Sequence, residues 1–303
     1  MNENEISHEI RNIASSCMKR WGEEDKKTVN FERRLDSFIK QIETNVTLRT
    51  VFLELIKQYN YYSRKHIEEL LKQFYKKVTD DLRLVEDVTI YSRIEDDSKI
   101  DSSNSFLEEF KVINEISNHF SHAIEKLKEA DFNEIENIVF LDDVIGSGNT
   151  VKTFFEENKS KLLKVNNFIF CIEVLDEAKD FLNEYFRENG FECKIISGNI
   201  HKKAFCEDHI FDDRCKDYEQ LLKDFEMNLW GGRKRNKNIL GYENSQATIS
   251  FFRNTPNNTI SSFWYQNKMW EGLFPRDDRK PLFKRGNRNK KNAVYNMSRL
   301  KEV

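Results

Sequence analysis

The stretch that decides the fold covers residues 138–150 and reads Ile-Val-Phe-Leu-Asp-Asp-Val-Ile-Gly-Ser-Gly-Asn-Thr. An apolar run with β preference leads into two adjacent acids, a small-residue loop and a helical pattern. We therefore predict a buried strand that ends at Asp142 and Asp143, followed by a turn into a helix. In an α/β protein such a turn lies at the carboxyl edge of the sheet, where these folds bind ligands.

The loop after the two acids has the composition of an anion site. Gly146 and Gly148 allow positive φ and a close approach of the backbone, and the amides from Ser147 to Thr150 lie at the positive end of a helix dipole. The hydroxyl groups of Ser147 and Thr150 add donors. The loop therefore suits a phosphate, and the acids before it suit vicinal hydroxyls beside that phosphate, as in a ribose 5-phosphate.

Three other interpretations explain fewer of these residues. A dinucleotide fingerprint needs a third glycine where Val151 stands, and the paired acids would repel a pyrophosphate. A P-loop needs a Gly-Lys-Ser/Thr run, which this loop lacks. A tight turn with an aspartate N-cap accounts for Gly148 but leaves the second acid, Gly146, Ser147 and Thr150 unexplained.

Similar β-rich runs alternate with amphipathic helix patterns on both sides of this stretch. The predicted strands cover 88–91, 137–141, 168–172, 193–196 and 247–252, and the predicted helices cover 106–127, 151–163, 178–186 and 218–229. Strands that alternate with helices are typical of βαβ units. We predict an α/β fold with a doubly wound, mainly parallel sheet.

The first 80 residues are predicted to be helical. Apolar residues recur at helical spacing from Phe31 to Val78, which fits three helices with Thr47 and Ser63 as caps. We expect a helical N-terminal region over 1–80, an α/β domain over 81–275 and a basic tail over 276–303.

The composition indicates a folded protein without a membrane segment. The 303 residues include 24 phenylalanines, and 33% of residues are charged, which argues against disorder. No apolar stretch approaches the ~20 residues of a membrane helix, and the N-terminus lacks signal-peptide features, so we expect a cytoplasmic protein. The net charge of −3 argues against a surface built to hold nucleic acid, although residues 276–303 alone carry +7.

Residues 141–150 resemble the phosphoribosyl-pyrophosphate (PRPP) loop of type I phosphoribosyltransferases. Both have an apolar strand, two acids, two aliphatic residues, a small-residue turn and a closing Ser or Thr, although Gly-Ser-Gly replaces the more usual Thr-Gly turn. The resemblance implies a sheet of the type I phosphoribosyltransferase kind and a ligand that is PRPP or a nucleotide with Mg²⁺. It assigns the ribose hydroxyls to Asp142 and Asp143, and the 5-phosphate to Gly146, Ser147, Gly148, Asn149 and Thr150.

Two later segments are similar to phosphoribosyltransferase-like domains of bacterial conflict systems, some of which accompany retron reverse transcriptases in phage defence. These segments are Gly-Tyr-Glu-Asn-Ser-Gln at 241–246 and Asn-Thr-Pro-Asn-Asn-Thr at 254–259, followed by Trp264. The resemblance implies an anti-phage role, with a reverse transcriptase and its nucleic-acid product as partners. The basic groups of 233–235 and 276–303 are the surfaces such a partner would contact, and a solvated tail explains the same charge.

Two loops are further candidate parts of the site. Lys99, Ser102 and Ser103 follow the first core strand and could hold a diphosphate at a helix N-terminus, but neighbouring aspartates oppose an anion and a solvated loop fits equally well. The second loop offers amide and hydroxyl groups to a nucleobase or pocket wall, with a tryptophan as a stacking face, and a self-bonded turn over a core tryptophan fits as well. Its residues are Asn254, Thr255, Asn257, Asn258, Thr259 and Trp264.

Two functions are consistent with these features. An enzyme would transfer a phosphoribosyl group or cleave a glycosidic bond at ribose C1, by orienting the leaving group and screening its charge. A non-catalytic module would sense PRPP or a nucleotide and regulate a partner complex. Turnover of the ligand distinguishes the two, and the sequence identifies no general base.

Overall fold

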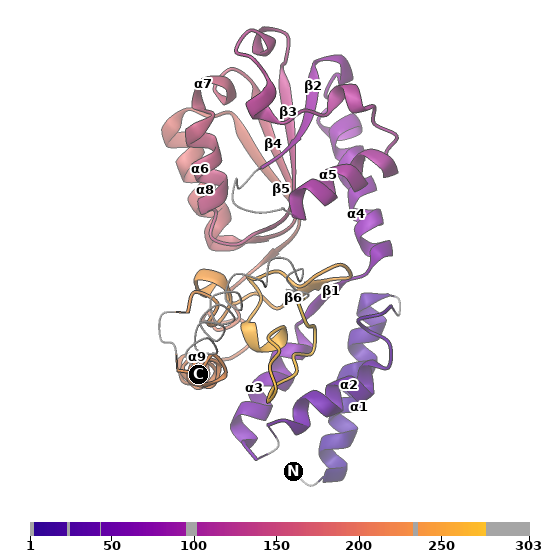
Figure 1. The fold of residues 1–303 in the computed structure, drawn as a ribbon, viewed down its shortest axis with the longest axis vertical. Coiled ribbons are helices and arrows are strands. Elements are labelled where there is room, and N and C mark those ends of the chain that lie inside the picture. The colour runs from indigo at the N-terminus through magenta and orange to yellow at the C-terminus, as the bar shows by residue number, and fades with distance from the viewer. Residues whose placement is uncertain (1–2, 23–24, 43, 95–101, 233–235, 277–303) are drawn as a thin grey trace, which may run out of the picture.

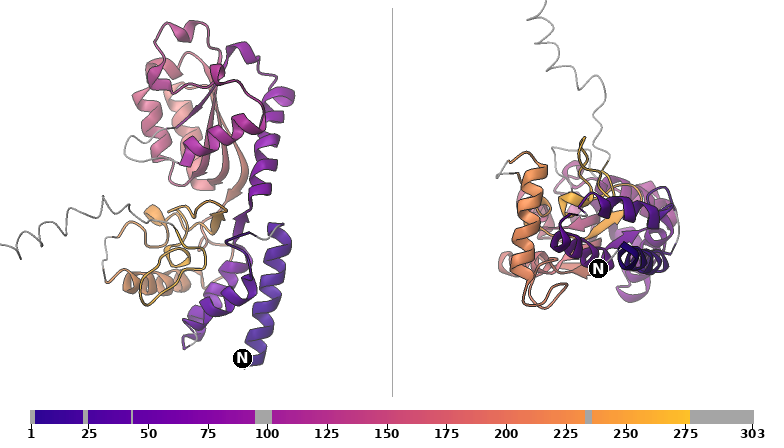
Figure 2. Two further views of the ribbon diagram at one scale, coloured as in Figure 1. Left: turned by 45° about the vertical axis from the view of Figure 1, so that its right-hand side comes forward. Right: turned by 90° about the horizontal axis from the view of Figure 1, so that it is seen from below.

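The computed structural model describes residues 3–22, 25–42, 44–94, 102–232 and 236–276. These residues form two lobes stacked along the long axis of the molecule (Figure 1). The upper lobe in this view holds a four-stranded sheet with its covering helices, and the lower lobe holds the N-terminal helices, a two-stranded sheet and the C-terminal segment. Figure 2 shows the same two lobes from a second side.

The sheet of the upper lobe is parallel throughout and has the strand order β2-β3-β4-β5. All four core strands predicted for this part of the sequence are confirmed, and each is longer than its apolar run because it continues through polar residues such as Asp142 and Glu173. The strands are β2 (Thr89–Arg93), β3 (Asn137–Ile145), β4 (Asn166–Leu175) and β5 (Cys193–His201).

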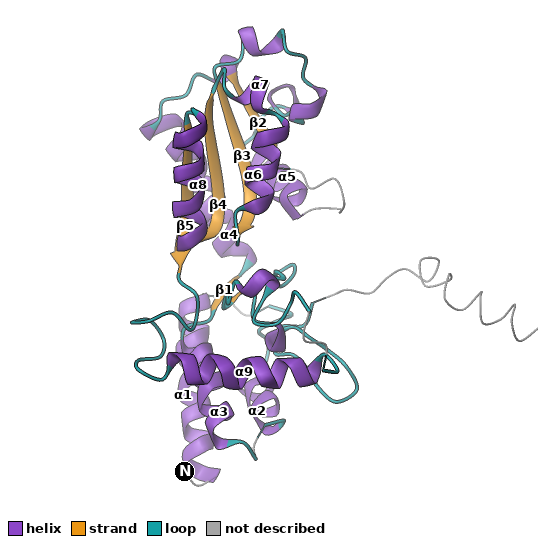
Figure 3. Cartoon of the chain, turned by 90° about the vertical axis from the view of Figure 1, so that its left-hand side faces the viewer, coloured by secondary structure: helices purple, strands orange, loops and turns teal. Residues whose placement is uncertain are grey.

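Side chains of the central strands alternate between two separate cores. Ile138 and Phe140 pack against α6 and α8, whereas Val139 and Leu141 pack against α4 and α5. All four are buried, because a central parallel strand is covered on both faces. Figure 3 shows α6 and α8 over one face of the sheet. The helices of this lobe are α4 (Arg64–Lys76), α5 (Ser102–Ile113), α6 (Asn149–Glu157), α7 (Lys159–Leu162) and α8 (Asp176–Asn189).

The connection after β2 and the connection after β3 lead to opposite edges of the sheet. After α5, Ser121 forms a parallel bridge with Tyr91 of β2, while Tyr91 also pairs with Val139 of β3. From β3 onward the chain adds β4 and β5 on the opposite side. The predicted doubly wound α/β fold is thereby confirmed, and its topological switch point lies between β2 and β3, where such sheets bind ligands.

The core of the lower lobe contains both the N-terminal helices and residues 260–274. The aromatic ring of Tyr59 stacks on Phe274 with ring centroids 4.7 Å apart and meets Phe263 edge-on at 5.0 Å. β1 pairs in parallel with β6, although the upper lobe and α9 lie between these two strands in the sequence. The elements of this lobe are α1 (Glu3–Trp21), α2 (Phe31–Lys40), α3 (Val46–Lys57), β1 (Asn60–Tyr62), α9 (Cys215–Leu229) and β6 (Ile249–Phe251).

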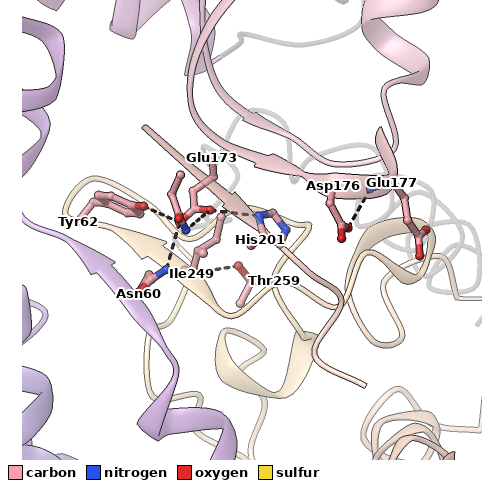
Figure 4. A network of polar contacts seen from close by, with 9 residues as sticks. Asn60, Tyr62, Glu173, Asp176, Glu177, His201, Ile249 and Thr259 are labelled. Atoms are coloured by element: carbon pink, nitrogen blue, oxygen red, sulfur yellow. Dashed lines mark hydrogen bonds and ion pairs between the residues drawn. The ribbon is translucent and has the colours of Figure 1, made fainter. Parts of the chain in front are cut away.

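A buried carboxylate connects the lobes (Figure 4). Glu173 of β4 is fully buried and accepts hydrogen bonds from Asn60 and Tyr62 of β1, and from Asn199 and His201 of β5. Burial opposes the charged form, but the bonds from His201, Tyr62 and Asn199 outweigh it and lower the pKa of Glu173 below its ordinary value of 4.5. Glu173 therefore holds both sheets through ionised oxygens.

Several local predictions need correction. The helix predicted over 106–127 ends at Ile113, and short 3₁₀ turns follow it. Ser63 caps α4 as predicted, but α3 is capped by Asn45, whose side chain accepts from the Leu48 amide, rather than by Thr47. The short strand β1 was not predicted, because three residues carry too little periodicity to be recognised.

The predicted division at residues 80 and 275 stays a prediction, but packing links segments across it. α4, which precedes residue 80, packs against the sheet, and residues 260–274 pack against α1, α2 and α3. No helix in the described ranges is long and apolar enough to cross a membrane.

Candidate functional site

The turn between β3 and α6 begins with the two acids inside the strand. Asp142 and Asp143 are half-buried, and each carboxylate accepts from the next backbone amide, Asp143 N at 2.8 Å and Val144 N at 2.9 Å. Asp142 pairs in register with Cys171 of β4. Burial, together with the negative charge of Asp142, raises the pKa of the Cys171 thiol, so this thiol stays protonated beneath the site.

The two glycines of the turn serve different purposes. Gly148 is the N-cap residue of α6 and has φ +77°, which favours glycine. Gly146 does not have positive φ, in contrast to the prediction. Instead, a Cβ at Gly146 would lie 1.9 Å from Nδ2 of Asn258, so any other residue at this position would require the Asn258 side chain of the lower-lobe loop to shift.

A cavity of about 450 Å³ lies at this turn, next to the switch point of the sheet. Its volume falls within the range of pockets that bind small molecules. The upper lobe contributes the β3–α6 turn, Ile94 after β2, and Ser105 and Phe106 of α5. The lower lobe contributes Phe251, Tyr242, residues 253–258 and Arg276.

The fold brings most of the predicted site residues to this cavity. Its lining includes Asp142, Asp143, Gly146, Ser147, Gly148, Thr150, Asn254, Thr255, Asn257 and Asn258. Asn149 is exposed on the first turn of α6, where its amide donates to Oε2 of Glu243 at 3.3 Å. This contact links the predicted phosphate turn to residues 241–246, one of the two later segments on which the family resemblance rests.

Three residues of the 254–264 region have buried structural contacts. The Thr255 hydroxyl donates to Phe274 O at 2.8 Å and the Thr259 hydroxyl to Ile249 O at 2.7 Å. Trp264 is 5% exposed and donates through its indole nitrogen to Thr259 O at 2.8 Å. Trp264 therefore packs in the core, and the partly exposed aromatic ring in the cavity lining is Tyr242.

The candidate diphosphate loop is described only at its end. Lys99 lies outside the described residues, and Ser102 and Ser103 are the first residues of α5. Because Ser105 and Phe106 line the cavity, the N-terminal part of α5 is close to it.

The residues of the lining that were not predicted as site residues include Arg253, Arg276 and Tyr242. The signal for Arg253 was its position immediately after a strand and before the Asn-Thr-Pro-Asn-Asn-Thr run. Arg276 was predicted only as part of the basic tail and Tyr242 only as part of the 241–246 segment, because both reach the cavity through the packing of the lower lobe.

The residues present fit Mg²⁺ only together with a ligand. In the described ranges no group of three or more His, Cys, Asp or Glu side chains is placed to hold a metal ion. Two neighbouring carboxylates do line the cavity, and Mg²⁺ is commonly held by one or two carboxylates plus ligand phosphates. Asp142 and Asp143 are thus the side chains that would hold such an ion.

A doubly wound sheet with two acids and a glycine turn at its switch point defines the chain as a phosphoribosyltransferase-like α/β protein. The family model PRTase-CE matches residues 35–276, and the chain belongs to this family. The match includes the β3–α6 turn and the 254–258 loop, which meet at the cavity.

The remaining comparisons are more distant. None of the curated proteins compared matches the chain. Among solved structures, a Helicobacter pylori xanthine-guanine-hypoxanthine phosphoribosyltransferase is similar at 10% identity and TM-score 0.32, over 47% of this chain and 89% of that one. The AQ2163 protein from Aquifex aeolicus is similar at 13% identity and TM-score 0.32, over 67% of this chain and 86% of that one.

Proposed function

We propose that the cavity binds the ribose-phosphate part of PRPP or of a nucleotide, together with Mg²⁺. One observation carries this proposal: the paired acids of β3 and the glycine turn before α6 lie side by side in a cavity at the switch point of the sheet. Membership of the PRTase-CE family supports it.

In this proposal each part of the turn meets a different part of the ligand. The backbone amides and hydroxyls of Ser147 and Thr150, at the N-terminus of α6, bind the 5-phosphate, where the helix dipole favours negative charge. Asp142 and Asp143 accept from the ribose hydroxyls or hold Mg²⁺ between the carboxylates and the ligand phosphates. Asn257 and Asn258 offer uncharged amide groups to the base or to the leaving group.

The reaction we propose is transfer or glycosidic cleavage at ribose C1. Such chemistry passes through an oxocarbenium-like state, so the protein has to orient the leaving group and stabilise charge rather than supply a covalent nucleophile. The alternative is a module with the same pocket that senses the ligand without consuming it. The two are distinguished by whether bound PRPP is turned over.

Thermal unfolding with and without PRPP and Mg²⁺ tests the binding site. Ligand at one hundred times its dissociation constant stabilises the folded state by about 2.7 kcal/mol, so we expect a clear rise in Tm for the wild type. The variant Asp142→Asn/Asp143→Asn should lose this rise, whereas Asp180→Asn, an exposed residue of α8, should keep it. An equal rise in all three proteins would contradict the assigned site.

We further propose, from the family resemblance, a role in anti-phage defence with a reverse transcriptase and its nucleic-acid product as partners. The basic residues that would contact nucleic acid, 233–235 and 277–303, lie outside the described residues. Co-purification with the reverse transcriptase and its loss on deletion of 277–303 would test this. Binding through backbone phosphates should weaken steeply with salt.

A further inference from the structure

Two arginines from the lower lobe line the same cavity as the paired acids. Arg253 lies two residues after the end of β6, and Arg276 is the last of the described residues. Neither belongs to the β3–α6 turn or to α5, so the lower lobe places positive charge at a site whose acids come from the upper lobe. A ligand that fits this cavity therefore meets both carboxylates and guanidinium groups.

Neighbouring side chains orient both guanidinium groups. Nη2 of Arg253 lies 2.7 Å from Oε2 of Glu109 on α5, and its Cζ lies 5.2 Å from the ring centroid of Phe252. Nη1 of Arg276 donates to Thr255 O at 3.1 Å, and its Cζ lies 5.9 Å from the ring centroid of Trp264. These contacts hold the two planar groups in place, which favours paired hydrogen bonds to an oxyanion.

A third basic side chain, that of Lys27, lies next to the cavity lining. Nζ of Lys27 donates to the carbonyl of Phe251, a residue of the cavity lining, at 3.1 Å. Burial, together with the positive charges of Arg34 and Arg276, lowers the pKa of Lys27 to about 8, although Asp25 opposes the shift. Cations gathered on one side of a pocket repel one another, and a bound anion relieves that repulsion.

We infer that Arg253 and Arg276 bind a second anionic group of the ligand, a diphosphate, while the β3–α6 turn binds the ribose and its phosphate. This inference rests on the proposed function and extends it, since it selects ligands that carry a diphosphate as well as a ribose phosphate. Arginine suits this task because its five donors form paired bonds with phosphate oxygens. The diphosphate site then belongs to the lower lobe, so ligand binding depends on how the two lobes pack.

Calorimetric titration of the full chain with separate parts of the ligand tests the inference. The probes are inorganic pyrophosphate and ribose 5-phosphate, each with Mg²⁺. PRPP and ATP are the whole ligands compared, because ATP carries a diphosphate beyond the phosphate on its ribose. We expect Arg253→Gln/Arg276→Gln to weaken pyrophosphate binding by at least about tenfold, as for loss of charge-assisted bonds, and to change ribose 5-phosphate binding by less than about twofold. Arg64→Gln is the matched control, because Arg64 also lies over the Phe252 ring, at 5.5 Å, but does not line the cavity.

The outcomes separate this inference from the proposed function. Ribose 5-phosphate binding without pyrophosphate binding, or pyrophosphate binding unchanged in the double variant, overturns the arginine site and leaves the proposed function in place. Pyrophosphate binding that depends on the arginines, without ribose 5-phosphate binding, supports the arginine site and overturns the proposed function. Binding of neither probe overturns both.

Two controls separate loss of binding from loss of folding. The Tm of each variant without ligand reports whether it folds. Arg253→Lys keeps the positive charge opposite Glu109 but loses the paired donors, so it should bind pyrophosphate with intermediate affinity. Wild-type affinity in Arg253→Lys would mean that charge alone is sufficient. Tighter binding of PRPP than of ATP would identify PRPP as the source of the diphosphate, and the reverse would identify a nucleotide.

Discussion

Glu173→Gln should lower the free energy of unfolding by about 3 kcal/mol at neutral pH, near the lower end of the cost of removing one charge from a buried pair. Glu173 is fully buried, and all four side chains that contact its oxygens act as donors. Glutamine keeps the volume but replaces one oxygen with an NH₂ group, which cannot accept a bond.

The geometry indicates where that NH₂ group would go. Oε1 accepts from Tyr62, Asn60 and Asn199, whereas Oε2 accepts from Asn199 and His201. His201 can change tautomer and accept through Nδ1, so the NH₂ group costs least at the Oε2 position. The remaining cost is the lost charge on bonds that join the two lobes. A loss of about 3 kcal/mol corresponds to a fall in Tm of about 5 °C for a chain of this size.

Urea unfolding at a series of pH values measures this effect. Because the folded-state pKa of Glu173 lies below its ordinary value of 4.5, its stabilisation is present above pH 4.5 and is lost as the pH falls through the folded-state pKa. The difference in free energy of unfolding between wild type and Glu173→Gln should therefore become smaller as the solution is acidified.

Glu177→Gln is the matched control for this experiment. Glu177 follows Glu173 by four residues and pairs with Lys203 at 2.6 Å, but its side chain is 60% exposed, so we expect a change below about 1 kcal/mol. A free energy of unfolding within about 1 kcal/mol of wild type, or a difference that is the same at acidic and neutral pH, would contradict a buried, ionised Glu173 that joins the two lobes.

Two further predictions follow from single contacts. A methyl group at Gly146 would lie 1.9 Å from Nδ2 of Asn258 and would overpack the turn. We therefore expect Gly146→Ala to fold but to bind ribose 5-phosphate at least about tenfold more weakly in calorimetry. Unchanged binding would show that the Asn258 side chain moves without disturbing the turn. Lys27 has a folded-state pKa of about 8 against an ordinary value of 10.5, so the folded state gains stability as the pH rises between these values, and Lys27→Met should lack this gain in urea unfolding. Identical pH profiles for the two proteins would contradict the burial of a charged Lys27.

Much of the fold could be predicted because its signals are local. The strand containing residues 138–141 is recognisable from its own apolar run, and Gly148 predicts a helix start from its own conformational freedom. The helix predicted over 106–127 was too long because apolar residues continue at helical spacing through 3₁₀ turns that pack against the sheet. Periodicity cannot separate these two cases.

The chemical groups of the β3–α6 turn could be predicted, because its acids, glycines and hydroxyls are close together in the sequence. The groups that face the turn could not, because they come from distant segments. Asn258 against Gly146, Arg253 and Arg276 at the cavity, and Tyr62 on Glu173, which is 111 residues away, are contacts between distant parts of the chain. Such contacts depend on how the two lobes pack, and packing is a property of the whole fold rather than of any local pattern.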